Sequence, residues 1–132
     1  MHSQNINWKE KTILVAEDDI VSYKQVQQLL THTNARVIWA ETGDEAVFFA
    51  KHKELCIDAV LMNIQIPELD GFATTKQLKA DHPNLPVIML YAQANNPQSS
   101  GIVNIFDGQV AKPIQNMELI KALQFCFEQA VA

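Results

Sequence analysis

The chain has few residues that could form covalent cross-links or a membrane anchor. It carries two cysteines in 132 residues, Cys56 and Cys126. Both sit beside apolar residues, so we expect buried free thiols in a reducing compartment. No apolar run approaches the roughly 20 residues that span a bilayer, and the polar start through Lys11 lacks the apolar segment typical of a signal peptide. These absences favour a soluble, cytoplasmic protein.

Positive charge is also scarce. Ten Lys and Arg residues stand against fifteen Asp and Glu residues, which gives a net charge of -5 and an isoelectric point of about 5.2. Affinity for nucleic-acid backbones and for anionic membrane surfaces comes mainly from Lys and Arg. We therefore expect a protein partner, and neither a nucleic acid nor a membrane.

Glycine is rare as well, with four residues in the whole chain. The sequence contains no glycine-rich phosphate-binding loop and no nucleophile elbow of the kind that Ser/His/Asp hydrolases use. The four histidines are far apart and fall on expected tail, helix or loop positions, which does not favour a histidine metal site. An independent enzyme activity is therefore the least favoured function.

What the chain does have is a regular alternation of short apolar runs and amphipathic stretches. We expect strands at residues 12–16, 36–40, 59–62, 86–90 and 109–111. A helix is predicted to start at Gly43, because Thr42 and Glu45 form a capping box. Other helical stretches follow the first, third and fifth strands, whereas residues 92–104 have room for at most a short helix.

The apolar runs lack polar alternation, as strands do when a parallel sheet is covered by helices on both faces. The sequence thus predicts one α/β domain over residues 12–130, after a tail at residues 1–11. The expected fold is a flavodoxin-like, doubly wound (βα)5 domain with a five-stranded parallel sheet. In the tail, Trp8 either packs against the domain or lies exposed. Functional sites of such sheets form outside the carboxyl ends of the strands.

Polar residues follow most of the expected strands at that edge. They are Glu17 and Asp18 after the first strand, Asn63 after the third, Tyr91 after the fourth and Lys112 after the fifth. Carboxylate and amide oxygens suit Mg²⁺, and an ammonium group opposite them would neutralise an anion such as a phosphoryl group. An acidic residue after a strand can equally be a helix cap, and Asp19 is placed to cap the next helix.

Together these segments resemble the receiver domains of two-component signalling, over about residues 11–130. The matching segments are ILVAEDD from Ile13, DAVLMNIQIPELDGF from Asp58, PVIML from Pro86 and VAKPI from Val110. In the second segment, Pro67, Asp70 and Gly71 keep the spacing of the family motif. The resemblance implies Mg²⁺ binding at Glu17 and Asp18, and a phosphate-contacting lysine at Lys112.

Three positions depart from the family. The resemblance implies a phosphoryl-accepting Asp where the chain has Asn63, a Ser or Thr at Tyr91 and a switch aromatic at Gln109. The neutral amide of Asn63 is a weak nucleophile, so we expect it not to accept a phosphoryl group. Its carbonyl oxygen would still help Glu17 and Asp18 to hold Mg²⁺, but weakly, because one negative charge is lost. The ring of Tyr91 is expected to pack over the pocket or to turn outward.

We therefore predict a receiver domain that does not accept phosphate at Asn63 and acts by protein–protein contact, without enzyme activity. Its surface would be the fourth and fifth strands and helices, and its partner a histidine kinase, a phosphotransfer protein or an output domain, with a homodimer as a further option. One alternative is an ordinary Mg²⁺-dependent phosphoacceptor receiver, of a response regulator or hybrid histidine kinase, present as an Asp-to-Asn variant. Three altered positions favour natural degeneration over one engineered change. The remaining alternative is a small enzyme on a flavodoxin-like sheet.

Overall fold

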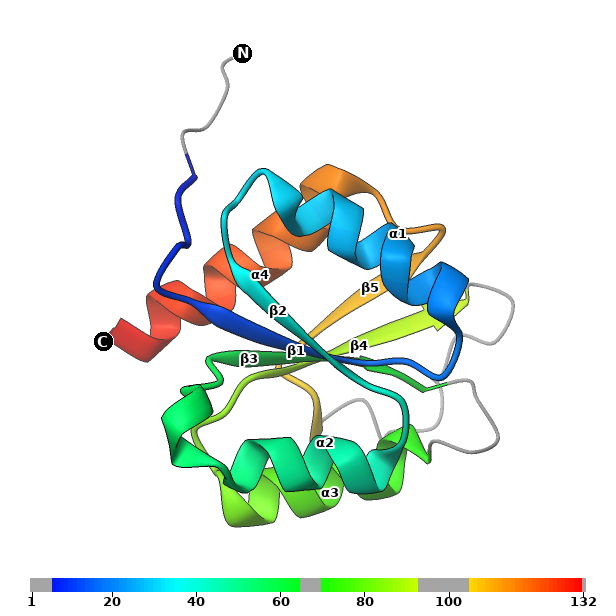
Figure 1. The fold of residues 1–132 in the computed structure, drawn as a ribbon, viewed down its shortest axis with the longest axis vertical. Coiled ribbons are helices and arrows are strands. Elements are labelled where there is room, and N and C mark those ends of the chain that lie inside the picture. The colour runs from blue at the N-terminus through cyan, green and yellow to red at the C-terminus, as the bar shows by residue number, and fades with distance from the viewer. Residues whose placement is uncertain (1–5, 65–69, 93–104, 132) are drawn as a thin grey trace.

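The computed structural model describes residues 6–64, 70–92 and 105–131, which form a sheet with helices on both faces (Figure 1). Five parallel strands pair in the order β2-β1-β3-β4-β5. The strands are β1 (Thr12–Ala16), β2 (Arg36–Ala40), β3 (Ala59–Asn63), β4 (Val87–Ala92) and β5 (Gly108–Lys112). The expected flavodoxin-like, doubly wound fold class is confirmed.

Among the described residues, two helices cover each face of the sheet. The helices α1 (Ile20–Thr31) and α4 (Asn116–Val131) lie on one side, and α2 (Gly43–Lys51) and α3 (Gly71–Asp81) lie on the other (Figure 1). A short 3₁₀ helix, η1 (Lys53–Leu55), follows α2. Most of the segment for which at most a short helix was expected, beyond Ala92, lies outside the described residues.

The strands bury separate cores on their two faces. Ile13 and Val15 pack with residues of α1 and α4, whereas Leu14 and Ala16 pack with residues of α2 and α3. Successive side chains of a strand point to opposite faces, so a strand that is covered on both sides must be apolar at every position. This explains the unbroken apolar runs of the sequence, including Met62 and Met89, which are fully buried.

Three helices begin at a side-chain cap. The caps are Asp19, Thr42 and Asp70, which accept from the backbone N–H groups of Ser22, Glu45 and Ala73 over 3.1, 3.1 and 3.0 Å. Each cap satisfies an N–H group that has no partner within its own helix. The predicted start of α2 at Gly43 is confirmed, and Asp19 has the capping role considered for it.

Three strands run further than their apolar runs indicated. Asn63 and Lys112 are the last residues of β3 and β5, and Tyr91 lies inside β4. The backbone ladder sets these ends, since Tyr91 pairs with Ala111 in the sheet register. At the other end β4 begins after Pro86, which has no N–H group to donate.

The segment before β1 is held against the domain. The ring of Trp8 meets that of Phe127 edge-on at 5.0 Å, and its backbone N–H donates to the carbonyl of Thr33 over 2.6 Å. The ammonium group of Lys11 lies 4.8 Å from the centre of the Phe127 ring. Of the two alternatives for Trp8, the structure shows packing against the domain.

Both cysteines are free thiols, but only one is buried. Cys126 is 4% exposed, and burial raises the pKa of its thiol to about 11. The expected burial of Cys56 is wrong. This residue closes η1 in the left-handed conformation, with φ of 54°, and its side chain lies at the surface. Within the described residues, no helix is both long and apolar enough to cross a membrane.

Candidate functional site

The site lies where the winding of the sheet changes direction. The central strands β1 and β3 are neighbours, and the chain adds β2 on one side and β4 and β5 on the other. Such a switch point leaves a crevice at the carboxyl ends of the strands. Glu17 follows β1 directly, and Asn63 ends β3.

Three side chains meet at this crevice, and we call Glu17, Asn63 and Lys112 the Glu17 cluster. The amide nitrogen Nδ2 of Asn63 donates to Oε1 of Glu17 over 2.7 Å. The ammonium nitrogen of Lys112 lies 3.7 Å from the same oxygen. Glu17 and Asn63 are each 2% exposed, so this contact is shielded from water. The structure thus brings together three of the residues that sequence reasoning singled out.

Strand alternation explains why these side chains share one side of the sheet. Leu61 packs in the core under α1 and α4, and Asn63 comes two residues later on the same strand. Val15 and Val110 belong to the same core, and Glu17 and Lys112 follow each by two residues. Side chains two residues apart in a strand lie on one face.

The carboxylate of Glu17 is bound at both oxygens. Its Oε2 accepts the backbone N–H of Asp19 over 3.1 Å, while Oε1 receives Asn63 and Lys112. Burial raises the pKa of Glu17, and the hydrogen bond from Asn63 and the charge of Lys112 partly oppose that rise. The neighbouring amide and ammonium groups therefore favour the ionised form, against the cost of removing a carboxylate from water.

Sequence reasoning missed the support behind Glu17. The indole Nε1 of Trp39 donates to the backbone carbonyl of Glu17 over 2.6 Å. The Trp39 ring stacks on that of Tyr23 at 4.7 Å with an interplanar angle of 10°. A buried indole needs a partner for its N–H group. That need was the one indication in the sequence that Trp39 would form a hydrogen bond. Trp39 therefore fixes the backbone that carries the carboxylate.

Gly71 is required by a close approach of α3 to the end of β3. A Cβ atom at this position would lie 2.9 Å from Cα of Ile64 and 3.1 Å from the carbonyl oxygen of Asn63. Both are backbone atoms, which cannot move aside as a flexible side chain would. Asp70 and Gly71 of the motif therefore have structural roles, as a helix cap and as a contact point beside Asn63.

Oxygen ligands for a cation remain at the site. Asp18 is half-buried and follows Glu17 in the chain; Asp18, Glu17 and the amide oxygen of Asn63 would supply oxygen donors of the kind that suits Mg²⁺. These residues fit a hard cation that keeps several of its waters. The described residues contain no group of three or more His, Cys, Asp and Glu side chains placed to hold a metal by themselves.

Tyr91 and Gln109 do not belong to the Glu17 cluster. Leu90 packs under α1 and α4, so alternation directs Tyr91 to the opposite face, where α2 and α3 lie. Tyr91 is 8% exposed, and Gln109, on the same face of β5, is exposed. The ring is thus not turned out to solvent, so the expected outward orientation is wrong, whereas its packing over the pocket stays a prediction.

The chain matches known proteins over most of its length. A family model of the response regulator receiver domain matches residues 13–124. The autoinducer 1 sensor kinase/phosphatase LuxN of Vibrio campbellii is 29% identical over 110 residues, which are 82% of this chain and 12% of that protein. Two-component system protein A of Emericella nidulans is 32% identical over 116 residues, 86% of this chain and 17% of that protein. The chain therefore spans only a small part of these relatives.

Solved structures with the same fold include receiver domains. One is the receiver domain of the sensor histidine kinase PA1611 of Pseudomonas aeruginosa, which holds a magnesium ion in its active-site cleft. Its TM-score is 0.77 and its sequence identity 29%, and the match covers 87% of this chain and 95% of that one. A CheY-like receiver domain protein of Methanospirillum hungatei has a TM-score of 0.80 and 21% identity, covering 91% and 95%.

Proposed function

The chain belongs to the response regulator receiver family, and on this premise we propose that it does not accept a phosphoryl group at Asn63 and acts in two-component signalling by protein–protein contact. One observation carries the proposal. The residue at the acceptor position uses its amide to donate a 2.7 Å hydrogen bond to Glu17.

The chemistry of an amide supports this proposal. Transfer of a phosphoryl group to a side chain needs an anionic oxygen that attacks phosphorus and forms an acyl phosphate. The amide of Asn63 is neutral, and delocalisation of its nitrogen lone pair leaves the oxygen a poor nucleophile. Its amide nitrogen also bonds the acidic neighbour. Glu17, Asp18 and Lys112 remain, but the group that would form the new bond is missing.

The electrostatics of the site point the same way. With Asp in place of Asn63, two buried carboxylates would face each other, and a cation would be needed to offset their repulsion. The Asn63 amide instead donates to Glu17, and Lys112 adds a positive charge 3.7 Å from the same oxygen. The cluster is therefore held together without a bound metal. We expect Mg²⁺ to bind more weakly than it would beside an Asp.

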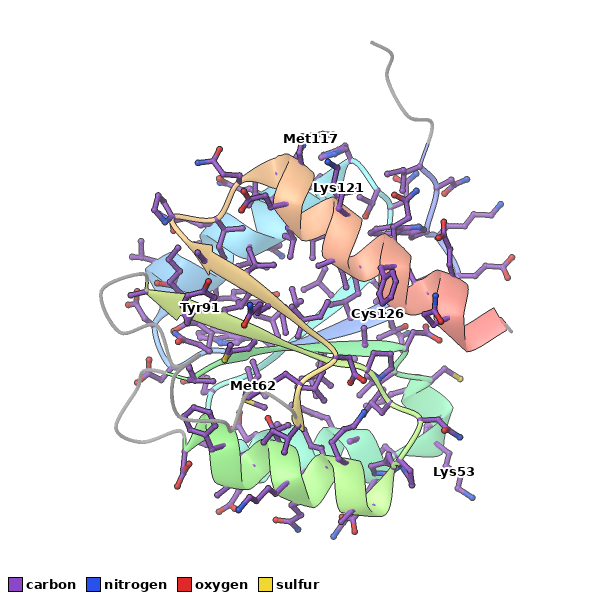
Figure 2. All side chains as sticks on the ribbon, turned by 180° about the vertical axis from the view of Figure 1, so that it is seen from behind. Lys53, Met62, Tyr91, Met117, Lys121 and Cys126 are labelled. Atoms are coloured by element: carbon purple, nitrogen blue, oxygen red, sulfur yellow. The ribbon has the colours of Figure 1, made fainter. Side chains whose placement is uncertain are left out.

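Exposed apolar side chains near the site support a protein partner. Ile20 and Val21, in the first turn of α1, are 48% and 61% exposed, and Met117, in the first turn of α4, is 57% exposed. The first of these turns comes three residues after Glu17 and the second follows Lys112, the last residue of β5. Figure 2 shows Met117 and Lys121 on the outer side of α4, away from the sheet. The partner we propose is a histidine kinase, a phosphotransfer protein or an output domain.

Treatment with acetyl phosphate and Mg²⁺, followed by intact mass spectrometry, tests the proposal. We expect no phosphoryl adduct on the native chain, because Asn63 lacks the nucleophile. An adduct that survives in the native chain and maps to Asn63 would overturn the proposal. Lys112→Ala is the matched control. It removes the ammonium group proposed to contact the phosphate but leaves Asn63 in place, so an adduct that this variant also carries is non-specific.

The intact acidic pair and Lys112 also favour the alternative of an ordinary phosphoacceptor receiver seen as a variant. The variant Asn63→Asp separates the two. An ordinary receiver would become phosphorylated with a small molecule donor and would transmit the change to the rest of the sheet. The absence of Mg²⁺-dependent phosphorylation in Asn63→Asp would count against the ordinary receiver.

A further inference from the structure

The edge of the sheet that β2 forms has no partner strand among the described residues. The strand order leaves β1 as the single neighbour of β2, and β2 lies in front of the other strands in Figure 1, between α1 and α2. An open edge presents a row of free N–H and C=O groups that can pair with another strand. What binds at this edge does not depend on the chemistry of Asn63.

The ladder between β2 and β1 shows which backbone groups are free. The N–H of Arg36 and the carbonyl of Ala40 both bind backbone groups next to the ends of β1, each over 2.9 Å. Residues of a paired strand direct their backbone groups alternately to its two sides. Every second residue from Arg36 to Ala40 therefore binds β1, and the N–H and C=O groups of Val37 and Trp39 point away from the sheet.

The free part of β2 lacks the usual protection against strand pairing. Natural edge strands carry prolines, bulges or inward-pointing charges that block a further strand. The free stretch here is Val37-Ile38-Trp39, three apolar residues that are each half-buried. The charged residue of β2 is Arg36, at its first position. The edge is therefore suited to pair with another apolar strand.

We propose that this edge binds the β2 edge of a second copy of the chain, in an antiparallel pair with two-fold symmetry. With Ile38 on the symmetry axis, Val37 of each copy lies opposite Trp39 of the other. Opposite residues whose backbone groups face each other exchange two hydrogen bonds. Two such pairs, with two bonds each, give four hydrogen bonds. The same patch serves both copies, as in an isologous dimer.

The charges at the two ends of β2 favour the antiparallel orientation. Arg36 begins the strand, whereas Glu41 follows its last residue and Glu45 lies in the first turn of α2. An antiparallel pair brings Arg36 of each copy to the acidic end of the other, and a parallel pair would place the two Arg36 side chains together. Facing opposite charges fix the register of an interface. Because each copy carries a net charge of -5 and two short strands bury little surface, the dimer is weak and forms at high protein concentration.

Backbone amide hydrogen exchange at low and high protein concentration tests the pairing, with analytical ultracentrifugation of the same samples. At high concentration we expect the mass to rise from 14.8 kDa towards twice that value, and the amides of Val37 and Trp39 to exchange more slowly. The amide of Ile38 is the internal control, because it binds β1 and should be protected at both concentrations. A chain that stays monomeric would overturn the proposal and leave the edge to a strand of another protein. A dimer in which the Val37 and Trp39 amides exchange as in the monomer would also overturn it.

Variants of β2 test the register. Val37→Pro removes an outward N–H group and no bond to β1, and proline is tolerated at such edge positions. It should weaken the dimer about tenfold, because each copy loses one donor. The exposed Lys76→Ala on α3 is the matched control and should dimerise as the native chain does. A dimer of unchanged affinity in Val37→Pro would overturn the proposal.

A charge swap keeps the proposal testable if Val37→Pro does not fold. Arg36→Glu should weaken the dimer, and Arg36→Glu/Glu41→Lys should restore it, which a general loss of stability would not do. An association constant that is the same in the native chain and in both of these variants would contradict the antiparallel pair.

Discussion

Glu17 is a buried carboxylate held by groups from four parts of the chain. Asn63, Lys112 and the backbone of Asp19 bind its oxygens, and Trp39 binds its carbonyl. Each contact compensates part of the cost of removing the charge from water. The acidic residues after the first strand indicated a polar site, but the Trp39 contact could not be predicted, because it depends on the register of β2 against β1.

The pH dependence of stability should show the burial of Glu17. Its pKa is raised above 4.5, so above pH 4.5 the folded chain binds more protons than the unfolded chain. Stability then falls as the pH rises from 4.5 until the raised pKa is passed. Urea unfolding of the native chain and of Glu17→Gln should show this fall in the native chain only. Parallel curves for the two proteins would contradict the prediction.

The two thiols should differ in reactivity. Burial raises the pKa of Cys126 to about 11, whereas Cys56 lies at the surface. Because the thiolate is the reactive form, a disulfide reagent at pH 8 should modify one thiol in the folded chain and the second only after unfolding. Cys56→Ser should remove the fast phase. Two thiols reacting at one rate would show that Cys126 is accessible.

At the scale of elements, caps were predictable and close approaches were not. Thr42 and Asp19 are read from the sequence, since a short polar side chain before a helical run has a local partner within three residues. Gly71 differs, because a glycine is needed there by the nearby backbone of Ile64 and Asn63, which lies outside α3. The burial of Tyr91 was also hidden, because an apolar run does not show whether the residue after it is covered.

The contact of α3 with β3 predicts the effect of adding a methyl group. Gly71→Ala would place a Cβ atom 2.9 Å from Cα of Ile64, so the helix must shift. Overpacking of this kind costs about 1–3 kcal/mol. The free energy of unfolding in urea should fall by that amount, whereas the exposed Lys76→Ala on the same helix should change it by less than about 0.5 kcal/mol. Equal stability of Gly71→Ala and the native chain would contradict the close approach.

For the molecule as a whole, the five-stranded sheet, its two covered faces and the convergence of Glu17, Asn63 and Lys112 could be predicted, because apolar runs and strand ends define a parallel α/β sheet. The hydrogen bond between Asn63 and Glu17 could not, since it depends on the distance between β1 and β3 across the switch point. That bond joins the end of β3 to the residue that follows β1.

Mg²⁺ affinity tests this account most directly. Isothermal titration of Mg²⁺ into the native chain and into Asn63→Asp compares an amide with a carboxylate at one position. We expect the native chain to bind Mg²⁺ at least about tenfold more weakly, because one anionic ligand is lost and the amide donates to Glu17. Equal affinities would contradict it, since they would mean that the Asn63–Glu17 bond does not replace the cation.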